Sequence, residues 1–408
     1  MLFHTKYRCS AGHFPRAGWR PRSKLLVCNI FGMLCEILPI SDTLALRPLC
    51  LVHQAGIAGF TAHFMRFLCL SVLFVFSSLF AATPSFAASE LDEREAIVAS
   101  VAKAFREERF AELNQMARRY REQKSRTASG VWRLASFYDG LSRAMWSYRA
   151  GKSNEDALRA VQEKLGRWLR RTPKAPAARI GFSMLYVAQA WAYRGDGPGS
   201  ALGAEAVDRF ELNITRAWYA LRDSKEYASV DPHWYVMMLT VARAQNWDRP
   251  QFEALVTEAV QREPLYYGIY FTAVEYLLPK WHGSIRDVEL FTRAATDRTA
   301  QREGESLYAR IYWNAAQTEF ENRLFKSTSA DWRRMKQGFE DIVARYPDLW
   351  NLSNYAKFAC LAGDRETTRK LLDRIGNSEE DWRAWEPGAL RPRCEKWAYA
   401  NDTASGAR

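Results

Sequence analysis

Apolar residues recur at three- and four-residue spacing along most of this chain, and that spacing places side chains on one face of an α-helix. Within residues 96–105, for example, Ile97, Val101 and Phe105 fall on the same face. The same pattern predicts helices within 110–120, 132–148, 156–169 and 180–193. Beyond residue 90 no segment of alternating apolar and polar residues competes with these helices, so the sequence predicts an all-α fold.

Short breaker segments separate the predicted helices. They include Thr172-Pro173, Asp231-Pro232, Glu263-Pro264 and Gly363-Asp364. Proline cannot continue a helix and glycine weakens one, so each breaker ends one helix and lets the next begin. Because these connections are short, we expect consecutive helices to pack antiparallel as hairpins.

Several of the predicted hairpins have a similar length. Pro232 and Pro264 lie 32 residues apart and enclose predicted helices at 234–244 and 252–260. Comparable pairs follow at 266–278 with 288–295, and at 349–361 with 367–375. A helix pair of this length is the unit of a helical-repeat protein, in which stacked neighbours bury a shared core. The segment 201–221 is too long for one arm of such a unit.

The last helix pair has small and bulky residues at characteristic positions. These are Ala356 in its first helix, Gly363-Asp364 in its turn, and Thr368 and Leu372 in its second helix. At these positions the chain resembles tetratricopeptide-repeat proteins. The resemblance implies that residues 88–378 stack antiparallel helix hairpins as a right-handed solenoid, with a protein or peptide bound on its concave face. Stretches 303–313 and 359–364 are also similar to a group of uncharacterised exported bacterial proteins, which implies no activity.

Residues 65–87 have the parts of a secretory signal peptide. Met65 and Arg66 form a short positive start, residues 67–80 are apolar, and Ser85 and Ala87 place small residues before a cleavage site. The apolar run is too short to span a membrane comfortably. We therefore expect a periplasmic or secreted protein, with no stable membrane span after the segment Met65–Ala87 is cleaved.

A signal peptide is expected at the start of a protein, yet this one begins at residue 65. The simplest explanation is that translation begins at Met65 and that residues 1–64 are an unstructured extension of the gene model. A genuine extension and an uncleaved membrane anchor are the alternatives. Since residues 1–64 show no sustained period, the fold is predicted only from residue 88 onward.

The formal net charge of the chain is +12, but its basic excess is uneven. Residues 1–87 hold eight Lys and Arg against two Asp and Glu, which is half of the excess. The rest of the chain is only mildly basic, and this argues against a nucleic-acid partner. Basic runs at 118–121 and 167–171 are interpreted as solvated helix faces, with an acidic partner or an anionic envelope polymer as the alternative. The oligomeric state is left open.

Only two cysteines follow the signal segment, Cys360 and Cys394, and an oxidising compartment favours their pairing. A bridge between them closes a loop of about 34 residues, for which the chain-entropy model gives about 3–4 kcal/mol. It would tie residues 379–408, predicted as a C-terminal cap with disordered last residues, to the helical domain. Two buried thiols are the alternative.

Tryptophan is abundant, with 15 residues in the chain. Our candidate binding residues are Trp281, Tyr308, Tyr312 and Trp313, since aromatic rings stack on peptide and sugar groups. The alternative is that these rings only pack between hairpins. Tyr308 and Tyr312 are four residues apart, so they share a helix face and could both be buried.

Catalytic residues are harder to find. His282, in the predicted loop 278–284, has the side chain best suited to proton transfer near neutral pH, and Glu305 is the other candidate. No nucleophile or second histidine at metal-ligand spacing accompanies them, so we predict no metal and no cofactor. His233 is expected instead to begin a helix that Asp231 caps.

Two functions fit these features. The first is an exported helical-repeat protein that binds a protein or peptide in the bacterial cell envelope. The second is an α/α-toroid hydrolase or lyase acting on an envelope polysaccharide. A toroid would bring the first and last hairpins together around a cleft, with His282 or Glu305 beside Tyr and Arg residues.

Overall fold

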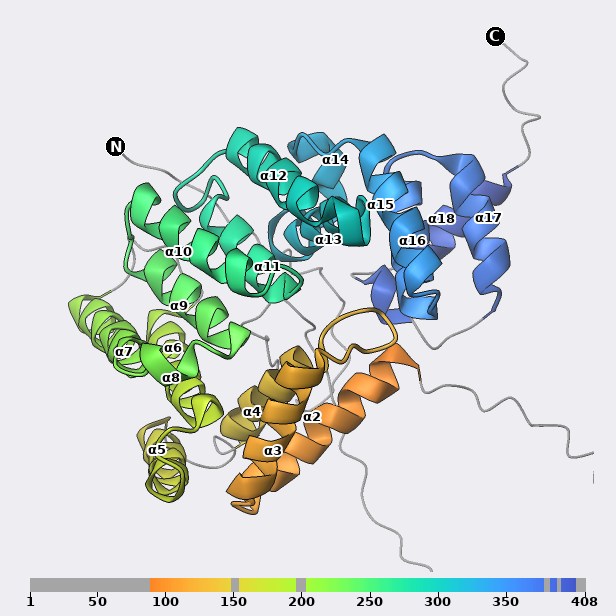
Figure 1. Ribbon diagram of the computed structural model, residues 1–408. Helices are drawn as coiled ribbons and strands as arrows, with labels where there is room; N and C mark the ends of the chain where they lie inside the picture. Colours follow the sequence, from red (N-terminus) through yellow and green to blue (C-terminus); the bar gives the residue numbers. More distant parts are fainter. Residues whose placement is uncertain (1–88, 148–153, 196–202, 378–381, 387–389, 401–408) are drawn as a thin grey trace, which may run out of the picture. The chain divides into compact units, whose positions relative to one another are not determined.

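The computed structural model describes residues 89–147, 154–195, 203–377, 382–386 and 390–400. Within these ranges the chain is helical, and its one extended pairing is an isolated antiparallel bridge between Arg126 and Trp132 (Figure 1). The predicted all-α class is confirmed. The predicted extension 1–64, the signal peptide 65–87 and the last residues 401–408 lie outside the described residues.

The first part of the described chain is a series of helices. They are α2 (Glu90–Arg106), α3 (Phe110–Gln123), α4 (Arg133–Ser147), α5 (Asn154–Arg171), α6 (Pro176–Arg194), α7 (Ala204–Arg222) and the short α8 (Lys225–Ala228). Each predicted segment in this region lies within, or within a residue or two of, one of these helices.

The second part continues in the same way. Its helices are α9 (Pro232–Ala244), α10 (Arg249–Arg262), α11 (Tyr267–Tyr276), α12 (Ile285–Glu303), α13 (Ser306–Ala315), the π-helix η3 (Ala316–Phe320), the 3-10 turn η4 (Glu321–Arg323), α14 (Leu324–Ser327), α15 (Trp332–Arg345), α16 (Leu349–Leu361), α17 (Arg365–Ile375), the 3-10 turn η5 (Trp382–Trp385) and α18 (Leu390–Tyr399). The prediction of 349–361 coincides with α16.

Side-chain caps explain where many of these helices begin. The Asp231 carboxylate accepts a hydrogen bond from the His233 backbone N–H at the start of α9, as the sequence predicted. Ser284 caps α12 and Asp364 caps α17 in the same manner. A short polar side chain at this position satisfies an N–H group that has no partner within the helix.

Most helices pack against a helix close to them in the sequence. The pairs are α2 with α4, α6 with α7, α9 with α10, α11 with α12, α13 with α15 and α16 with α17 (Figure 1). Helix α11 also contacts α9 and α13, so these three helices lie in one row. The described part of the long segment 201–221 belongs to α7, whose 19 residues match the 19 residues of its partner α6.

The helix pairs do not follow one fixed repeat length. The first helices of four successive pairs begin at Pro232, Tyr267, Ser306 and Leu349, so their spacing grows from 35 to 39 to 43 residues. The longest interval contains η3, η4 and α14, which extend the connection between α13 and α15. Insertions of this kind change how each pair is placed on the next.

The loop 124–132, between α3 and α4, connects the first helices to helices much later in the chain. The Ser129 carbonyl oxygen accepts hydrogen bonds from the Arg310 guanidinium (2.7 Å) and the Asn351 amide (3.2 Å). The Ser129 N–H donates to the Glu90 carboxylate (2.7 Å). In a simple stack each pair touches only its neighbours, so these contacts between distant pairs go beyond the repeat pattern.

Arg126, in the same loop, reaches a buried cluster on α11 and α12. Its guanidinium lies 3.4 Å from the Glu303 carboxylate and 5.0 Å from the centre of the Tyr267 ring. The Tyr267 hydroxyl donates to Glu303, and the Arg310 guanidinium lies 4.7 Å from the same ring. Two cations therefore contact one aromatic ring, an arrangement that orders the loop against the later helices.

Cys360 and Cys394 form a disulfide bond, with their Cα atoms 5.9 Å apart. This confirms the predicted pairing. The bond joins the end of α16 to α18, which packs on both α16 and α17. The described part of the predicted cap, 382–386 and 390–400, is thus tied covalently to the last helix pair.

Candidate functional site

The loop 277–284, between α11 and α12, holds Trp281 and His282 in a fixed conformation. The Trp281 N–H donates to the Leu278 carbonyl (2.9 Å), and the His282 N–H donates to the Tyr276 carbonyl (3.1 Å). Gly283 is required here, because a Cβ atom at this position would lie 2.2 Å from the Leu277 carbonyl oxygen. The loop is therefore a tight, hydrogen-bonded turn, and Trp281 has a defined position.

Trp281 lies against the ends of two other helices. Its ring centre is 6.1 Å from that of Trp191, in the last turn of α6, and the two rings meet edge to face at 84°. The Arg243 guanidinium, in the last turn of α9, lies 5.1 Å from the Trp281 ring. Trp191 and Trp281 are both half-buried, so part of each ring faces solvent. We call Trp191, Trp281 and Arg243 the aromatic platform.

Charged groups hold the platform in place. Arg243 forms an ion pair with Glu275 of α11, and burial lowers the pKa of the Arg243 guanidinium to about 10. The Arg194 guanidinium lies 5.3 Å from the centre of the Trp191 ring. A cation over a tryptophan ring is attracted by the negative ring face. The platform is consequently preorganised, which lowers the entropy lost on binding a ligand.

His282 lies beside the platform. Its ring stacks on Tyr276 with the ring centres 4.5 Å apart, and its buried Nε2 atom has no hydrogen-bond partner among the described residues. Lys280, in the same loop, pairs with Glu319 of the π-helix η3. A π-helix is uncommon and is often found at functional sites. The ends of α6, α9 and α11, together with η3, thus meet around this loop.

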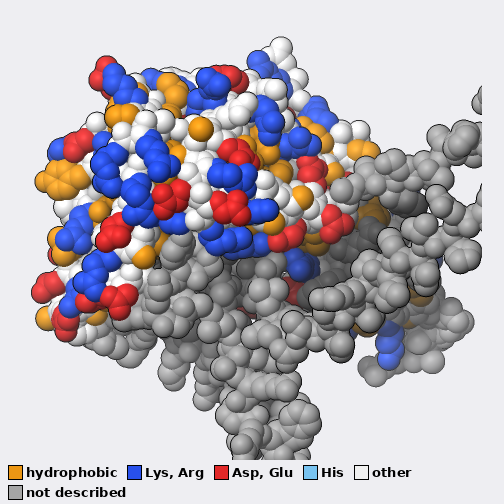
Figure 2. All heavy atoms as spheres, turned by 90° about the horizontal axis from the view of Figure 1, so that it is seen from below, with side chains coloured by type: hydrophobic (Ala, Val, Ile, Leu, Met, Phe, Trp, Pro, Cys, Tyr) orange, Lys and Arg blue, Asp and Glu red, His pale blue; other side chains and the backbone are white. Residues whose placement is uncertain are grey.

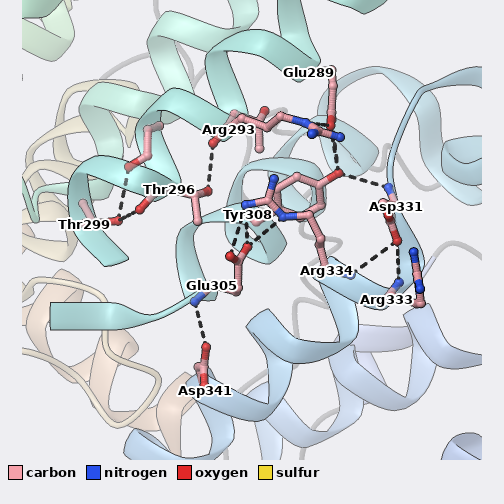
Figure 3. A network of polar contacts seen from close by, with 12 residues as sticks. Glu289, Arg293, Thr296, Thr299, Glu305, Tyr308, Asp331, Arg333, Arg334 and Asp341 are labelled. Carbon is pink, nitrogen blue, oxygen red and sulfur yellow. Dashed lines mark hydrogen bonds and ion pairs between the residues drawn. The ribbon is translucent and has the colours of Figure 1, made fainter. Parts of the chain in front are cut away.

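Glu305, the second catalytic candidate, does not share this site. It precedes α13, whereas His282 precedes α12, and the 19 residues of α12 separate them by about 28 Å at 1.5 Å per residue. The Glu305 carboxylate accepts two hydrogen bonds of 3.1 Å from Arg334, whose guanidinium lies 4.7 Å from the Tyr308 ring (Figure 3). Glu305 therefore has the Tyr and Arg neighbours that the toroid alternative requires, but its carboxylate is already ion-paired with Arg334.

Tyr308 and Tyr312 are fully buried and bond to one carboxylate. Both hydroxyl groups donate to Glu289 of α12. The Tyr308 oxygen also accepts from the Asp331 backbone N–H at 3.0 Å (Figure 3). Burial raises the pKa of both phenols. These two candidate binding residues join α12, α13 and the start of α15, so their observed contacts are structural.

Trp313, the last candidate, packs between helix pairs. Its ring centre lies 6.1 Å from Phe339 of α15 and 6.2 Å from Trp350 of α16. The side chain is 7% exposed, and its buried indole nitrogen has no hydrogen-bond partner among the described residues. Of the four binding candidates, only Trp281 combines a defined position with an accessible ring.

A second histidine cluster is buried at the junction of α4, α9 and α11. The His233 ring stacks on Tyr138 at 3.9 Å, and its Nδ1 atom lies 3.0 Å from the Tyr266 hydroxyl. Tyr138 donates to Asp231 (2.9 Å), and burial lowers the pKa of His233 to about 3 and raises that of Asp231. The sequence pointed to the Asp231 cap, but nothing local indicated the two tyrosines, which come from distant segments.

Among the described residues no group of three or more His, Cys, Asp or Glu side chains is placed to hold a metal ion. Nor does any helix in the described ranges have the length and apolar character to cross a membrane. No protein-family model, curated protein or solved structure matches this chain.

Proposed function

We propose that this chain is an exported helical-repeat protein that binds a protein or peptide in the bacterial cell envelope. In this proposal the helix pairs from α9 to α17 stack as a tetratricopeptide-like right-handed solenoid. The side-by-side order of α9, α11 and α13 supports it, because a row of equivalent helices creates an extended surface for a chain-like ligand.

The aromatic platform is the observation that carries the proposal. Trp191 and Trp281 come from different helix pairs, keep part of each ring exposed, and are held by arginines. Tryptophan and arginine are the residue types most often dominant in protein interfaces. A proline or aromatic side chain of a peptide would stack on the exposed part of these rings.

Export is supported by two independent features. Residues 65–87 have the composition of a signal peptide, and Cys360 is bonded to Cys394. Structural disulfides are typical of oxidising compartments and rare in the cytosol. Cell fractionation followed by N-terminal sequencing tests this part, and we expect a mature chain that begins at Ala88.

Selection of a random peptide library on the purified full-length gene product tests the binding function. For the enriched peptides, we expect Trp281→Ala and Trp191→Ala to weaken affinity at least tenfold in fluorescence polarisation, as for interface residues that contribute most of the affinity. Trp397→Ala is the matched control, since Trp397 is 37% exposed on α18. Circular dichroism of each variant checks folding.

The proposal fails if no peptide is enriched, or if Trp397→Ala weakens binding as much as Trp281→Ala does. An equal loss would mean that exposed tryptophans bind the peptides non-specifically. A loss confined to the platform variants would place the binding surface at the ends of α6, α9 and α11.

The contacts of loop 124–132 with α13 and α16 favour retaining a second candidate, the α/α-toroid hydrolase or lyase. Contact between early and late helix pairs is what a closed ring requires. The acid in this proposal is Glu305, which Arg334 would have to release on substrate binding. Incubation with peptidoglycan and common polysaccharides tests it, with released reducing or unsaturated ends as the expected product and Glu305→Gln as the inactive variant.

A further inference from the structure

Two stretches of this sequence are basic and contain no acidic residue. Residues 164–195 hold seven Lys and Arg and no Asp or Glu, and residues 113–121 hold three Arg and no Asp or Glu. Lys and Arg in globular proteins are ordinarily interspersed with acids, so such stretches leave a local positive potential. The two stretches are far apart in sequence, and only the fold decides whether their charges add.

The structure packs the two stretches against each other. The Asn114 side chain of α3 donates to the Thr172 hydroxyl (3.2 Å) and accepts from the indole nitrogen of Trp168 (3.0 Å). The Arg171 guanidinium lies 5.3 Å from the ring of Phe110, one helical turn before Asn114. The C-terminal end of α5 is therefore in direct contact with α3.

Five cations are exposed around this contact, and we call them the basic corner. They are Arg118, Arg119, Arg170, Arg171 and Lys174. Within the described ranges none of the five forms an ion pair, whereas nearby Arg167 and Lys164 both pair with the Glu108 carboxylate. Arg171 is the one member of the corner whose charge also helps to lower the pKa of Glu108, and no carboxylate of the described residues lies within ion-pair distance of any of the five.

The residues of the corner point to phosphate groups as its partner. Guanidinium groups bind phosphate oxygens through paired hydrogen bonds. The exposed large apolar side chains of the described chain lie elsewhere, at Val207, Leu212, Tyr219, Val230, Leu290, Trp397 and Tyr399. A protein interface normally has an apolar centre, and the corner has none. Four cations on α3 and α5, with Lys174 in the turn that follows α5, also exceed what one small anion can engage.

We propose that the basic corner binds the phosphate headgroups of an anionic phospholipid bilayer. Figure 2 shows Lys and Arg side chains in several groups on one face of the molecule, with Asp and Glu side chains among them. Such binding is electrostatic and peripheral, because the corner has no apolar side chain to insert. Each Lys or Arg near an anionic bilayer strengthens binding about fivefold at moderate salt, and the attraction falls within a Debye length.

Cosedimentation of the full-length protein with vesicles tests the proposal. The vesicles contain 30 mol% phosphatidylglycerol in phosphatidylcholine, with pure phosphatidylcholine as the reference. We expect the pair Arg170→Gln and Arg171→Gln to lower the partition coefficient about 10- to 30-fold. The same pair changed to Lys should bind within about threefold of the wild type, because charge is retained.

A second pair controls for net charge. Arg298 and Arg302 are exposed on α12, and changing both to Gln removes the same charge away from the corner. We expect the partition coefficient of this double variant to fall by less than about threefold, because the attraction between a charge and the bilayer is screened beyond a Debye length. An equal loss in both pairs overturns the proposal, and so does an absence of binding to the anionic vesicles at 0.1 M salt.

Competitors separate the bilayer from other anions. Inhibition of vesicle binding by 10 mM inorganic phosphate would indicate a small-anion site and overturn the proposal. Stronger binding to a 20-base-pair DNA or to polyglutamate than to the vesicles would overturn it as well, in favour of another class of polyanion. The platform variant Trp281→Ala should leave vesicle binding unchanged. A failure of the bilayer proposal can therefore be distinguished from a failure of the peptide-binding proposal.

Discussion

Glu90, at the start of α2, holds the loop 124–132 in place. Its carboxylate accepts hydrogen bonds from the Thr127 hydroxyl (2.9 Å), the Ser129 N–H (2.7 Å) and the Ser129 hydroxyl (2.8 Å). The Glu90 side chain is 1% exposed, so water cannot replace it. The same loop accepts the hydrogen bonds that link it to α13 and α16, and Glu90 therefore supports contacts between distant helix pairs.

We expect Glu90→Ala to lower the free energy of unfolding by about 3–5 kcal/mol. Hydrogen bonds to a charged group contribute about 1.5–3 kcal/mol each, and three are lost. Removing the carboxylate also removes its own desolvation cost, which brings the net loss to the range measured when one partner of a buried charged contact is deleted. Glu90→Gln keeps the shape and part of the accepting capacity, so a loss of about 1.5–3 kcal/mol is expected.

Urea unfolding followed by circular dichroism measures this loss, with the slope checked for two-state behaviour. Glu95→Ala on the same helix is the control, because the Glu95 side chain is 53% exposed and pairs with Arg143 at the surface. Surface pairs contribute about 0–1 kcal/mol. Trypsin should also cleave Glu90→Ala faster after Arg126. A loss below about 1 kcal/mol for Glu90→Ala, or one equal to that of Glu95→Ala, would refute the reasoning.

Three further predictions concern other parts of the fold. Changing Cys360 and Cys394 to Ser should cost about 3 kcal/mol of unfolding free energy, and a reductant should then lower the Tm of the wild type only. Gly130→Ala should cost about 2–3 kcal/mol in urea unfolding, because φ is +89° and the new Cβ would clash with an aromatic ring; an effect under about 0.5 kcal/mol would contradict this. His233 should stay neutral when folded, since its pKa is about 3 against about 6.5 when unfolded. The free energy of unfolding should therefore fall from pH 6.5 towards pH 4, by up to about 1.4 kcal/mol per pH unit. His233→Gln should remove this part of the pH dependence. It should leave the contribution of Asp231, which has the opposite sign because the pKa of Asp231 is raised.

Local patterns were enough to predict the helices and some of their ends. The spacing of Ile97, Val101 and Phe105 indicated α2, and the segment 349–361 coincides with α16. The Asp231 cap was predicted because it depends on residues two positions apart. The disulfide was predicted because only two cysteines follow the signal segment, which left one possible pairing.

The candidate site was only partly predictable. Trp281 and His282 stood out in the sequence because they lie together in a loop between two predicted helices. Their neighbours Trp191 and Arg243 did not, because each is one aromatic or basic residue among many in an amphipathic helix. Tyr308 and Tyr312 were predicted from the sequence as binding residues, whereas in the structure their hydroxyl groups donate hydrogen bonds to Glu289.

Sequence alone determined the helical class and the covalent link at the C-terminal end, because each depends on periodicity or on counting residues of one type. Tertiary structure decided which distant residues meet: Ser129 with Arg310 and Asn351, Trp191 with Trp281, and the two basic stretches of α3 and α5. Such meetings depend on the angle between successive helix pairs. That angle is set by side-chain packing over the whole stack, which no short window of sequence contains.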